Sequence, residues 1–470
     1  MLSKTDFLTY LEAPMHLWAK THHQLEDHSP TPYEQYLAQQ GQAIENLARE
    51  YLEGMIESQK DHLYWQKTFD DGRFQIRVDA LIFELGTTSQ TAGVYDLYEI
   101  KSSTTIKKDH EHDLAFQAVL LESLLPLRDT YILHIDRNYL HGQQLDLDAF
   151  FIIENMADRV EKRRDEVIAL RQDALRVSQM PEPNPEYACT RPGSCPCPDL
   201  CHPHLPPYPI YHLPYLGKKA LTLRDMGVLA IEEIPTGFPL SSRQHQHVDA
   251  VRKGGPIINA QSIQTSLAEM QYPLYFLDYE TFNPAVPIFP GYQPYEHIVF
   301  QFSLFEVEKP GAELQHYEAL IADGRDPAPL IVQALVEHVG FEGSIVVWNQ
   351  SFEAGRNRDL ARHCPEYAEQ LLAINERLFD LMLIFRDGHY VHPDFNGSAS
   401  LKAVLPVLCP DLGYKNMAIP DGETAMLTWY WLQSGVIPPE ERQKTIEAMK
   451  AYCKMDTYGM VAIWEKLCAL

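Results

Sequence analysis

Four acidic residues in the C-terminal half of this 470-residue sequence are spaced as ligands of divalent metal ions. Asp278 and Glu280 interrupt an apolar strand-like segment, and the two-residue period of a strand puts both carboxylates on one face. Glu353 follows a later strand-like segment, while Tyr452 and Asp456 lie four residues apart on one side of an expected helix. Four converging carboxylates repel one another unless cations lie between them. Two Mg²⁺ or Mn²⁺ ions would neutralise the group and position an attacking water.

A second set of charged residues lies in the N-terminal half. Asp79 falls inside an alternating apolar segment, where an unpaired carboxylate is costly to bury. Glu99 and Lys101 end the next strand-like segment and share one face of it. On adjacent strands, Asp79 and Glu99 can hold one divalent cation, and Lys101 can orient a water or help to deprotonate it. The simpler alternative is a surface ion pair on two strands.

Four of the eight cysteines are grouped between these two sets. Cys189, Cys195, Cys197 and Cys201 lie in a proline-rich segment, and the other four are scattered. A secreted disulfide scaffold would be smaller and richer in cysteine, so the cluster is interpreted as a metal site. Four thiolates suit zinc or an iron–sulfur cluster, and the residues alone leave both open.

The composition limits the class of protein. A hydrophobic content of 45% and a charged content of 22% are typical of a globular chain, and 470 residues fit two or three domains. The net charge of −26 argues against nucleic-acid binding, which usually needs a basic face, although bound metal ions offset such a charge locally. The sequence has no apolar run long enough to span a membrane and no secretory signal at residues 1–10, so a cytoplasmic location is expected.

The periodicity of apolar residues predicts an α/β protein of several domains. We expect one α/β unit over residues 1–180, the cysteine segment over 181–215, a helical linker with a candidate helix–turn–helix over 216–270, and a second α/β unit over 271–470. Strands are expected over residues 73–83, 94–101, 130–136, 275–279, 298–306 and 344–348. Helices are expected over residues 33–56, 109–125, 154–177, 221–234 with a turn at Gly227, 329–339, 400–408 and 440–467.

The order of the first set resembles the PD-(D/E)xK nuclease superfamily, and particularly its RecB-like branch. Asp79 is followed by Glu99-x-Lys101 at the end of the next strand, and the resemblance covers roughly residues 1–205. It implies a core like that of restriction endonucleases. It also implies Mg²⁺ or Mn²⁺ bound by the two carboxylates, with Lys101 as a catalytic residue.

Two further residues match motifs of the RecB-like branch. The sequence Gly41–Glu45 is similar to the upstream helical motif of this branch, which often has histidine at the position of Glu45. Gln117 matches the glutamine of the helix after Lys101, while Leu121 stands where the branch has an aromatic residue. The resemblance implies Glu45 as a metal ligand and Gln117 as a catalytic residue.

The RecB-like nucleases of CRISPR adaptation systems and the AddB-type helicase–nucleases hold a 4Fe–4S cluster. One of its cysteines comes from near the N-terminus and three come from after the nuclease core. Residues Asp6–Ala19 look like that N-terminal segment, but Ala13 stands where the cysteine is expected. The resemblance therefore favours a 4Fe–4S cluster whose ligands are all four grouped cysteines, with Zn²⁺ as the alternative.

The order of the C-terminal motifs resembles the DnaQ-like exonucleases of the ribonuclease H superfamily, in the DEDDy branch whose third motif is Tyr-x3-Asp. The matching residues are, in chain order, Asp278, Glu280, Asn349, Glu353, Tyr452 and Asp456. Glu353 stands where the family usually has aspartate, and residues 400–404 resemble the helix between motifs two and three. The resemblance covers about residues 272–467. It implies a 3′–5′ exonuclease in which the four carboxylates bind metal and Tyr452 orients the water.

The whole chain is similar to a bacterial family of uncharacterised proteins that fuse a RecB-like nuclease to a ribonuclease H-like domain. This similarity implies the architecture but not the biological role. Our first hypothesis is a metal-dependent nuclease that acts on single-stranded DNA or duplex ends in repair, recombination or defence against foreign DNA, with partner proteins of such a system. Two alternatives stay open. One is a protein that binds nucleic-acid ends or a partner through degenerate sites, which the acidic charge favours, and the other is RNA processing by the C-terminal half.

Overall fold

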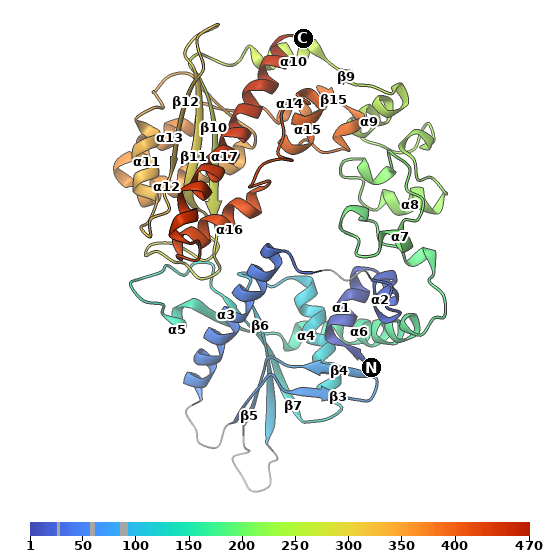
Figure 1. The fold of residues 1–470 in the computed structure, drawn as a ribbon. Coiled ribbons are helices and arrows are strands. Elements are labelled where there is room, and N and C mark those ends of the chain that lie inside the picture. Colours follow the sequence, from blue (N-terminus) through green and yellow to red (C-terminus); the bar gives the residue numbers. More distant parts are fainter. Residues whose placement is uncertain (26–28, 57–61, 85–92) are drawn as a thin grey trace. The chain divides into compact units, whose positions relative to one another are not determined.

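The computed structural model describes residues 1–25, 29–56, 62–84 and 93–470. The chain is mixed α/β and multidomain, as the sequence predicts, and it forms two compact units (Figure 1). Unit 1 consists of Met1–His204 together with Pro284–Glu296, and unit 2 consists of Leu205–Asn283 together with His297–Leu470. No helix in the described residues is long and apolar enough to cross a membrane.

Unit 1 contains a five-stranded sheet, ordered β2-β5-β6-β7-β8, and a three-stranded sheet, ordered β1-β4-β3. The strands are β1 (Leu2–Ser3), β2 (His62–Trp65), β3 (Thr68–Asp70), β4 (Phe74–Arg77), β5 (Ala80–Glu84), β6 (Val94–Lys101), β7 (Leu127–Ile135) and β8 (Phe151–Asn155). The helices are α1 (Lys4–Glu12), α2 (Pro14–Thr21), α3 (Pro32–Met55), α4 (Lys108–Leu121), α5 (Leu147–Phe150), α6 (Ala157–Ser178) and α7 (Pro198–Cys201).

The central strand β6 is buried on both faces because its side chains alternate between two cores. Leu97 packs in the core that includes residues of α1, α2, α4 and α6, whereas Tyr98 and Ile100 pack in the core that includes residues of α3. Strand period two therefore directs Glu99 to the same face as Leu97, toward α4. The parallel pairing of β6 with β7 is possible because α4 lies between these two strands in the chain.

The segment around Asp79 differs from the prediction of one strand over residues 73–83. The chain instead forms β4 and β5, which belong to different sheets, and Asp79 lies between them. The backbone N–H of Val78 donates to Lys67 O, and Asp79 O accepts from the N–H of Gln66. An alternating pattern cannot reveal this change of sheet, because it predicts which side chains are buried but not which strand lies beside them.

Unit 2 contains a five-stranded sheet, ordered β12-β11-β10-β13-β14, and a two-stranded sheet of β15 and β9. The strands are β9 (Ile257–Ile258), β10 (Leu274–Phe282), β11 (Ile298–Val307), β12 (Gln315–Leu320), β13 (Ser344–Val347), β14 (Leu378–Asp380) and β15 (Tyr390–Val391). The helices are α8 (Lys219–Asp225), α9 (Ser242–Lys253), α10 (Ala260–Leu267), α11 (Ala328–Val336), α12 (Gln350–His363), α13 (Ala368–Asn375), α14 (Leu383–Arg386), α15 (Leu401–Leu408), α16 (Gly422–Gln433) and α17 (Pro439–Cys468).

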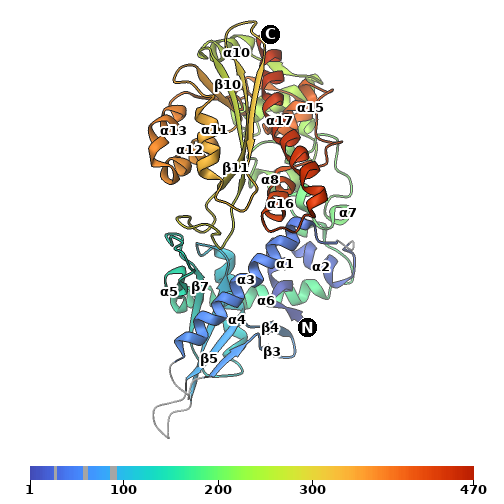
Figure 2. The same ribbon diagram turned by 60° about the vertical axis from the view of Figure 1, so that its left-hand side comes forward.

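Strand β10 lies at the centre of the unit 2 sheet, antiparallel to β11 and parallel to β13. Helices α11 to α13 cover one face of this sheet and α17 covers the other (Figure 2). Tyr275, Leu277 and Tyr279 belong to the core that includes residues of α11 and α12, whereas the ring of Phe276 meets Trp464 of α17 at 5.6 Å. The alternate residues Asp278 and Glu280 therefore face α17.

Two segments depart from the expected organisation. Residues Pro284–Glu296, which connect β10 to β11, pack in unit 1, where Ala285 joins the core beneath α3. Of the expected helix, turn and second helix over residues 221–234, the structure contains α8 and a turn at Gly227 with a φ of 76°. The prediction of a second helix is wrong. Only a 3₁₀ turn, Ile231–Glu233, follows there.

Truncation of Phe116 should destabilise unit 1. The Phe116 ring is fully buried, with its centroid 4.5 Å from that of Phe7 and 5.6 Å from that of Phe74. We expect Phe116→Ala to lower the free energy of opening at β6 and β7, measured by hydrogen exchange, by about 3–5 kcal/mol. Leu124→Ala removes a side chain that is 47% exposed and should change the same quantity by less than about 0.5 kcal/mol.

Candidate metal sites

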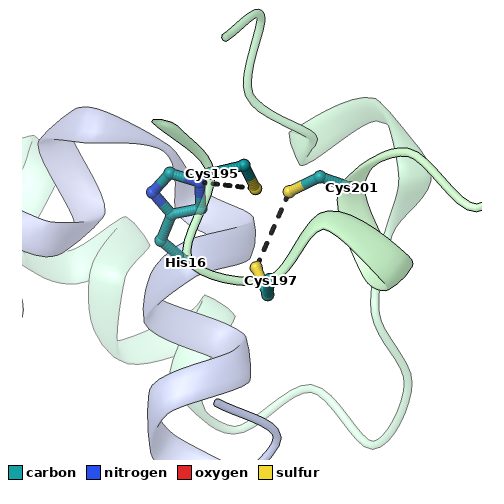
Figure 3. A group of neighbouring side chains, drawn as sticks. All are labelled: His16, Cys195, Cys197 and Cys201. Atoms are coloured by element: carbon teal, nitrogen blue, oxygen red, sulfur yellow. Dashed lines mark hydrogen bonds between the residues drawn. The ribbon is translucent and has the colours of Figure 1, made fainter. Parts of the chain in front are cut away.

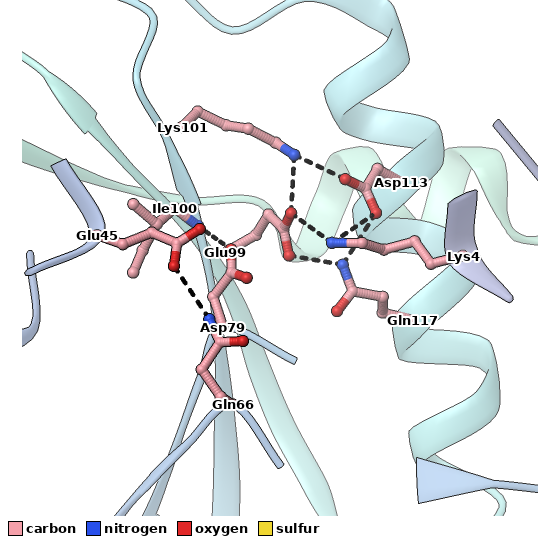
Figure 4. A network of polar contacts seen from close by, with 9 residues as sticks. All are labelled: Lys4, Glu45, Gln66, Asp79, Glu99, Ile100, Lys101, Asp113 and Gln117. Atoms are coloured by element: carbon pink, nitrogen blue, oxygen red, sulfur yellow. Dashed lines mark hydrogen bonds and ion pairs between the residues drawn. The ribbon is translucent and has the colours of Figure 1, made fainter. Parts of the chain in front are cut away.

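Glu99 is the centre of the first group of charged side chains (Figure 4). Glu99 is 1% exposed, and three side chains donate hydrogen bonds to its carboxylate. Lys101 Nζ donates to Oε1 at 2.7 Å, Lys4 Nζ donates to the same oxygen at 2.8 Å, and Gln117 Nε2 donates to Oε2 at 2.6 Å. The structure thus brings Glu99, Lys101 and Gln117 together, and it adds Lys4 from α1.

Asp113 on α4 completes this network. Its carboxylate accepts from Lys101 Nζ at 2.6 Å and from Gln117 Nε2 at 3.0 Å, and Lys4 Nζ lies 3.5 Å away. Sequence analysis missed both Asp113 and Lys4. Asp113 is four residues before Gln117 on the same helix, a spacing that puts two side chains on one helical face and that could have identified it.

Asp79 and Glu45 lie beside this network and share a pocket of about 360 Å³ that Lys4 also lines. Asp79 Oδ2 accepts from the backbone N–H of Ile100 at 2.9 Å, and Glu45 Oε2 accepts from Gln66 Nε2 at 3.2 Å. These two carboxylates have no lysine among the ion pairs of the described residues. Of the three expected metal ligands, Asp79 and Glu45 therefore line the pocket, whereas Glu99 is paired with two lysines.

The pKa values in this group follow from burial and from the two lysines. Burial and the charge of Glu99 raise the pKa of Asp79 to about 8 and that of Asp113 to about 6. Burial also acts to raise the pKa of Glu99, but the charges of Lys101 and Lys4 outweigh it and hold this pKa well below its usual range. Burial acts to lower the pKa of Lys101, but Glu99 and Asp113 outweigh it and raise this pKa. Lys101 is therefore held as a positive charge between Glu99 and Asp113.

The second group of carboxylates is carried by β10 and α17 in unit 2. Asp278, Glu280 and Cys453 each have a ligand atom within 4.8 Å of the other two. Cys453 Sγ lies 3.9 Å from Asp278 Oδ2. Burial raises the pKa of Asp278 and of Glu280 well above the usual range, and the charge of Asp456 raises both further.

Asp456 joins this group from α17, one helical turn after Tyr452. Its carboxylate accepts a hydrogen bond from the Tyr414 hydroxyl, and the Tyr452 hydroxyl also acts to lower its pKa. Lys402 Nζ lies 5.5 Å from the centre of each of these two rings, and its charge acts to lower the pKa of Asp456 and of Glu280. Lys402 is the nearby cation that sequence analysis missed, although residues 400–404 were matched to a motif helix.

Glu353 approaches the same group from the start of α12. It is 2% exposed, and its Oε2 has no hydrogen-bond partner among the described residues. Burial raises its pKa to about 8, with a further contribution from Asp380 that the charge of Arg356 partly offsets. Its own charge raises the pKa of Asp278. The four carboxylates expected to bind metal are therefore one electrostatic group, in which repulsion is only partly offset by Lys402 and Arg356.

The grouped cysteines lie together with two histidines in unit 1. His16 from α2, Cys195, Cys197 and Cys201 place their ligand atoms within 4.8 Å of one another and point toward a common centre (Figure 3). A second, overlapping set consists of Cys189, Cys195 and His202. These residues could hold a metal ion. His16 was missed, although it lies in the N-terminal segment where a cysteine was expected at position 13.

The similar proteins do not identify an activity for this chain. The family described as Domain of unknown function (DUF2779) matches residues 275–400, which include nearly all of β10 and the whole of α12 and end before α17. The Uncharacterized protein UU173 of Ureaplasma parvum serovar 3 is 23% identical over 270 residues, which are 53% of this chain and only 39% of that protein. The crystal structure of SSO0001 is similar over 42% of this chain and 85% of its own, with 12% identity and a TM-score of 0.23.

Without metal, the stability of the protein should decrease as the pH rises. The folded protein keeps a proton on Glu353 up to about pH 8, whereas the unfolded chain releases it near the ordinary value of 4.5. The unfolded chain thus binds fewer protons between these values, and the free energy of unfolding falls with pH there. Urea denaturation in EDTA at several pH values measures this slope.

Glu353→Gln should make the slope shallower, and Mn²⁺ at pH 8 should recover stability in the parent protein. Glu369→Gln changes an exposed residue of α13 and should leave the slope as it is. A slope that is the same in all three proteins would contradict the carboxylate group as its origin.

Proposed function

We propose that this protein is a divalent-metal-dependent nuclease that hydrolyses phosphodiester bonds, with DNA as the substrate. The observation that carries the proposal is the group of four carboxylates in unit 2, two of which lie on one buried strand. Asp278 and Glu280 are close together and have pKa values raised by burial and by Asp456. Such a group is unfavourable without cations, and Mg²⁺ or Mn²⁺ would neutralise it and activate a water at a phosphate.

The residues around this group support cleavage rather than simple binding. Tyr452 lies one helical turn before Asp456, and its hydroxyl acts to lower the pKa of that carboxylate, so we infer that it lies close enough to orient a water there. Lys402 places a positive charge beside the same residues, where it can meet a phosphate. The mixed sheet with β10 at its centre and α17 on one face is compatible with the ribonuclease H-like exonuclease fold that the motifs imply.

The charged group of unit 1 supports a second cleavage site of the PD-(D/E)xK type. Glu45 and Asp79 line one pocket, which could accept a divalent cation next to Glu99. Lys101 and Gln117 both hold the Glu99 carboxylate and fix its orientation. The order of β5, β6, α4 and β7 is compatible with the restriction-endonuclease-like core that the sequence implies.

One observation favours a different role for unit 1. Glu99 already receives three donors, two of them lysines, so a metal ion at this residue must displace Lys4 or share the carboxylate with it. Unit 1 could therefore be a degenerate site that binds nucleic-acid ends or a partner protein of a repair or defence system, while unit 2 cleaves. RNA remains a second substrate class for unit 2. Carboxylates that bind metal ions act on the phosphate, so they do not distinguish ribose from deoxyribose.

Cleavage of labelled single-stranded DNA, duplex DNA and RNA in Mg²⁺ or Mn²⁺ tests the proposal. We expect Asp278→Asn to abolish 3′–5′ degradation, a loss larger than the ~10–100-fold that outer-shell residues of metal sites cost. Asp411→Asn, at an exposed position of unit 2, is the matched control and should retain activity. Absence of metal-dependent degradation of all three substrates by the parent protein would falsify the nuclease assignment.

Lys101→Ala tests whether unit 1 contributes an independent activity. Because the two groups lie in different units, their effects should be nearly additive. We expect Lys101→Ala to remove one product pattern on gels and to leave the pattern lost in Asp278→Asn. If each variant removes all activity on every substrate, the two-site proposal is wrong, and if Lys101→Ala changes no product, unit 1 is a binding module.

A further inference from the structure

His16 combines two properties that are unfavourable for an ordinary buried histidine. It is 5% exposed, and its Nδ1 has no hydrogen-bond partner among the described residues. Its Nε2 points at Cys195 Sγ, 3.5 Å away. A buried polar group is normally paired, and an unpaired one is usually explained by an ion or a ligand that the protein binds there.

The arrangement around His16 is that of a metal-bound imidazole. Metal-bound histidines usually donate their second ring N–H to a carboxylate or a carbonyl, which fixes the tautomer. Glu12 Oε2 lies 3.8 Å from His16 Nδ1, and the Glu12 side chain is 73% exposed, so a small rotation lets it accept this N–H. Nε2 is then the ring nitrogen without a proton, and it faces the cysteines.

The sulfur positions discriminate between the two metal centres that the sequence left open. A tetrahedral ion with metal–sulfur bonds of about 2.3 Å holds neighbouring sulfurs about 3.8 Å apart. The Cys197 and Cys201 sulfurs are 3.8 Å apart, and the donor atoms of Cys195 and His16 lie within 4.8 Å of both. In a 4Fe–4S cubane each cysteine binds a different iron, which keeps the sulfurs farther apart.

We propose that the cysteine segment forms a mononuclear zinc site with His16, Cys195, Cys197 and Cys201 as its ligands. Each thiol loses its proton on binding, so the site contributes three thiolates and one neutral imidazole. Cys189 is outside this set and pairs with His202, whose Nε2 lies 3.3 Å from its sulfur. The proposal concerns the metal centre of unit 1 and does not depend on nuclease activity.

A structural role follows from where the ligands lie in the chain. His16 belongs to α2, near the N-terminus, whereas the three cysteines come after α6 in a segment with little regular structure. The ion would therefore reinforce the connection of α2 to the 189–204 segment, whose buried cysteines already share a core with residues of α2. His16 and Cys189 also line a pocket of about 550 Å³, which gives an entry path for the ion.

Metal analysis and zinc titration of the purified full chain test the ligand set. We expect one zinc and no iron per chain, and a Kd for zinc that rises in His16→Ala by more than about 100-fold. Cys189→Ser and His202→Ala are the matched controls, because they change the neighbouring Cys–His pair, and they should keep one zinc with the Kd of the parent protein. Glu12→Gln should weaken binding by about 10-fold or more.

His16→Cys distinguishes a lost ligand from a lost fold. It should bind one zinc, and after exchange for Co²⁺ its thiolate-to-cobalt absorption should exceed that of the parent by about one third, because four thiolates replace three. Brown protein with about four irons per chain overturns the proposal. Loss of metal in Cys189→Ser with retention in His16→Ala also overturns it. None of these measurements depends on nuclease activity. A protein that binds one zinc but cleaves no nucleic acid would therefore contradict the proposed function and still support the zinc site.

Discussion

The constraint on which much of this structure depends is that a buried carboxylate needs a compensating charge. The central strands β6 and β10 each carry acidic side chains on a face covered by helices. Desolvation of such groups costs several kcal/mol per ion unless a partner is close. The two units meet this requirement differently. Glu99 in unit 1 is paired with two lysines. In unit 2, Lys402 acts to lower the pKa of Glu280, but burial and neighbouring carboxylates keep the pKa values of Asp278 and Glu280 raised.

The first two helices of the chain connect the features of unit 1. Lys4 of α1 holds the Glu99 carboxylate, and His16 of α2 reaches the grouped cysteines. The two helices pack against each other and against α6. Because packed helices leave little empty space between them, a displacement of one helix also shifts the other. The two helices thus each supply one side chain to a candidate site of unit 1, Lys4 to the charged group and His16 to the cysteine group.

Local patterns predicted the elements that carry most of the candidate residues. The strand over residues 94–101 has the predicted bounds, and the expected helix over 440–467 is α17 within a residue at each end. These predictions succeed because alternation and helical periodicity reflect burial directly. They also indicate which neighbours share a face, such as Asp278 with Glu280.

Two of the residues that sequence analysis missed, Lys4 and His16, are partners from distant parts of the chain. Lys4 meets Glu99 across 95 residues, and His16 meets Cys195 across 179. No local period encodes such a pairing, because it depends on how whole elements pack. The change of sheet at Asp79 was missed for the same reason, since the apolar pattern continues unbroken from one sheet into the other. Sequence therefore indicates which side chains share one strand or helix face, but not which distant element supplies their partners.

The place of residues 284–296 in unit 1 has a consequence for biosynthesis. Ala285 packs in the core beneath α3, and the backbone of Gly291 and Tyr292 pairs with that of His141. A chain that grows from its N-terminus folds its domains in order as they emerge from the ribosome. Here the first unit lacks part of its core until β10 has been made and residue 296 has emerged. Unit 1 can therefore complete its fold during translation only after the first part of unit 2 has been synthesised.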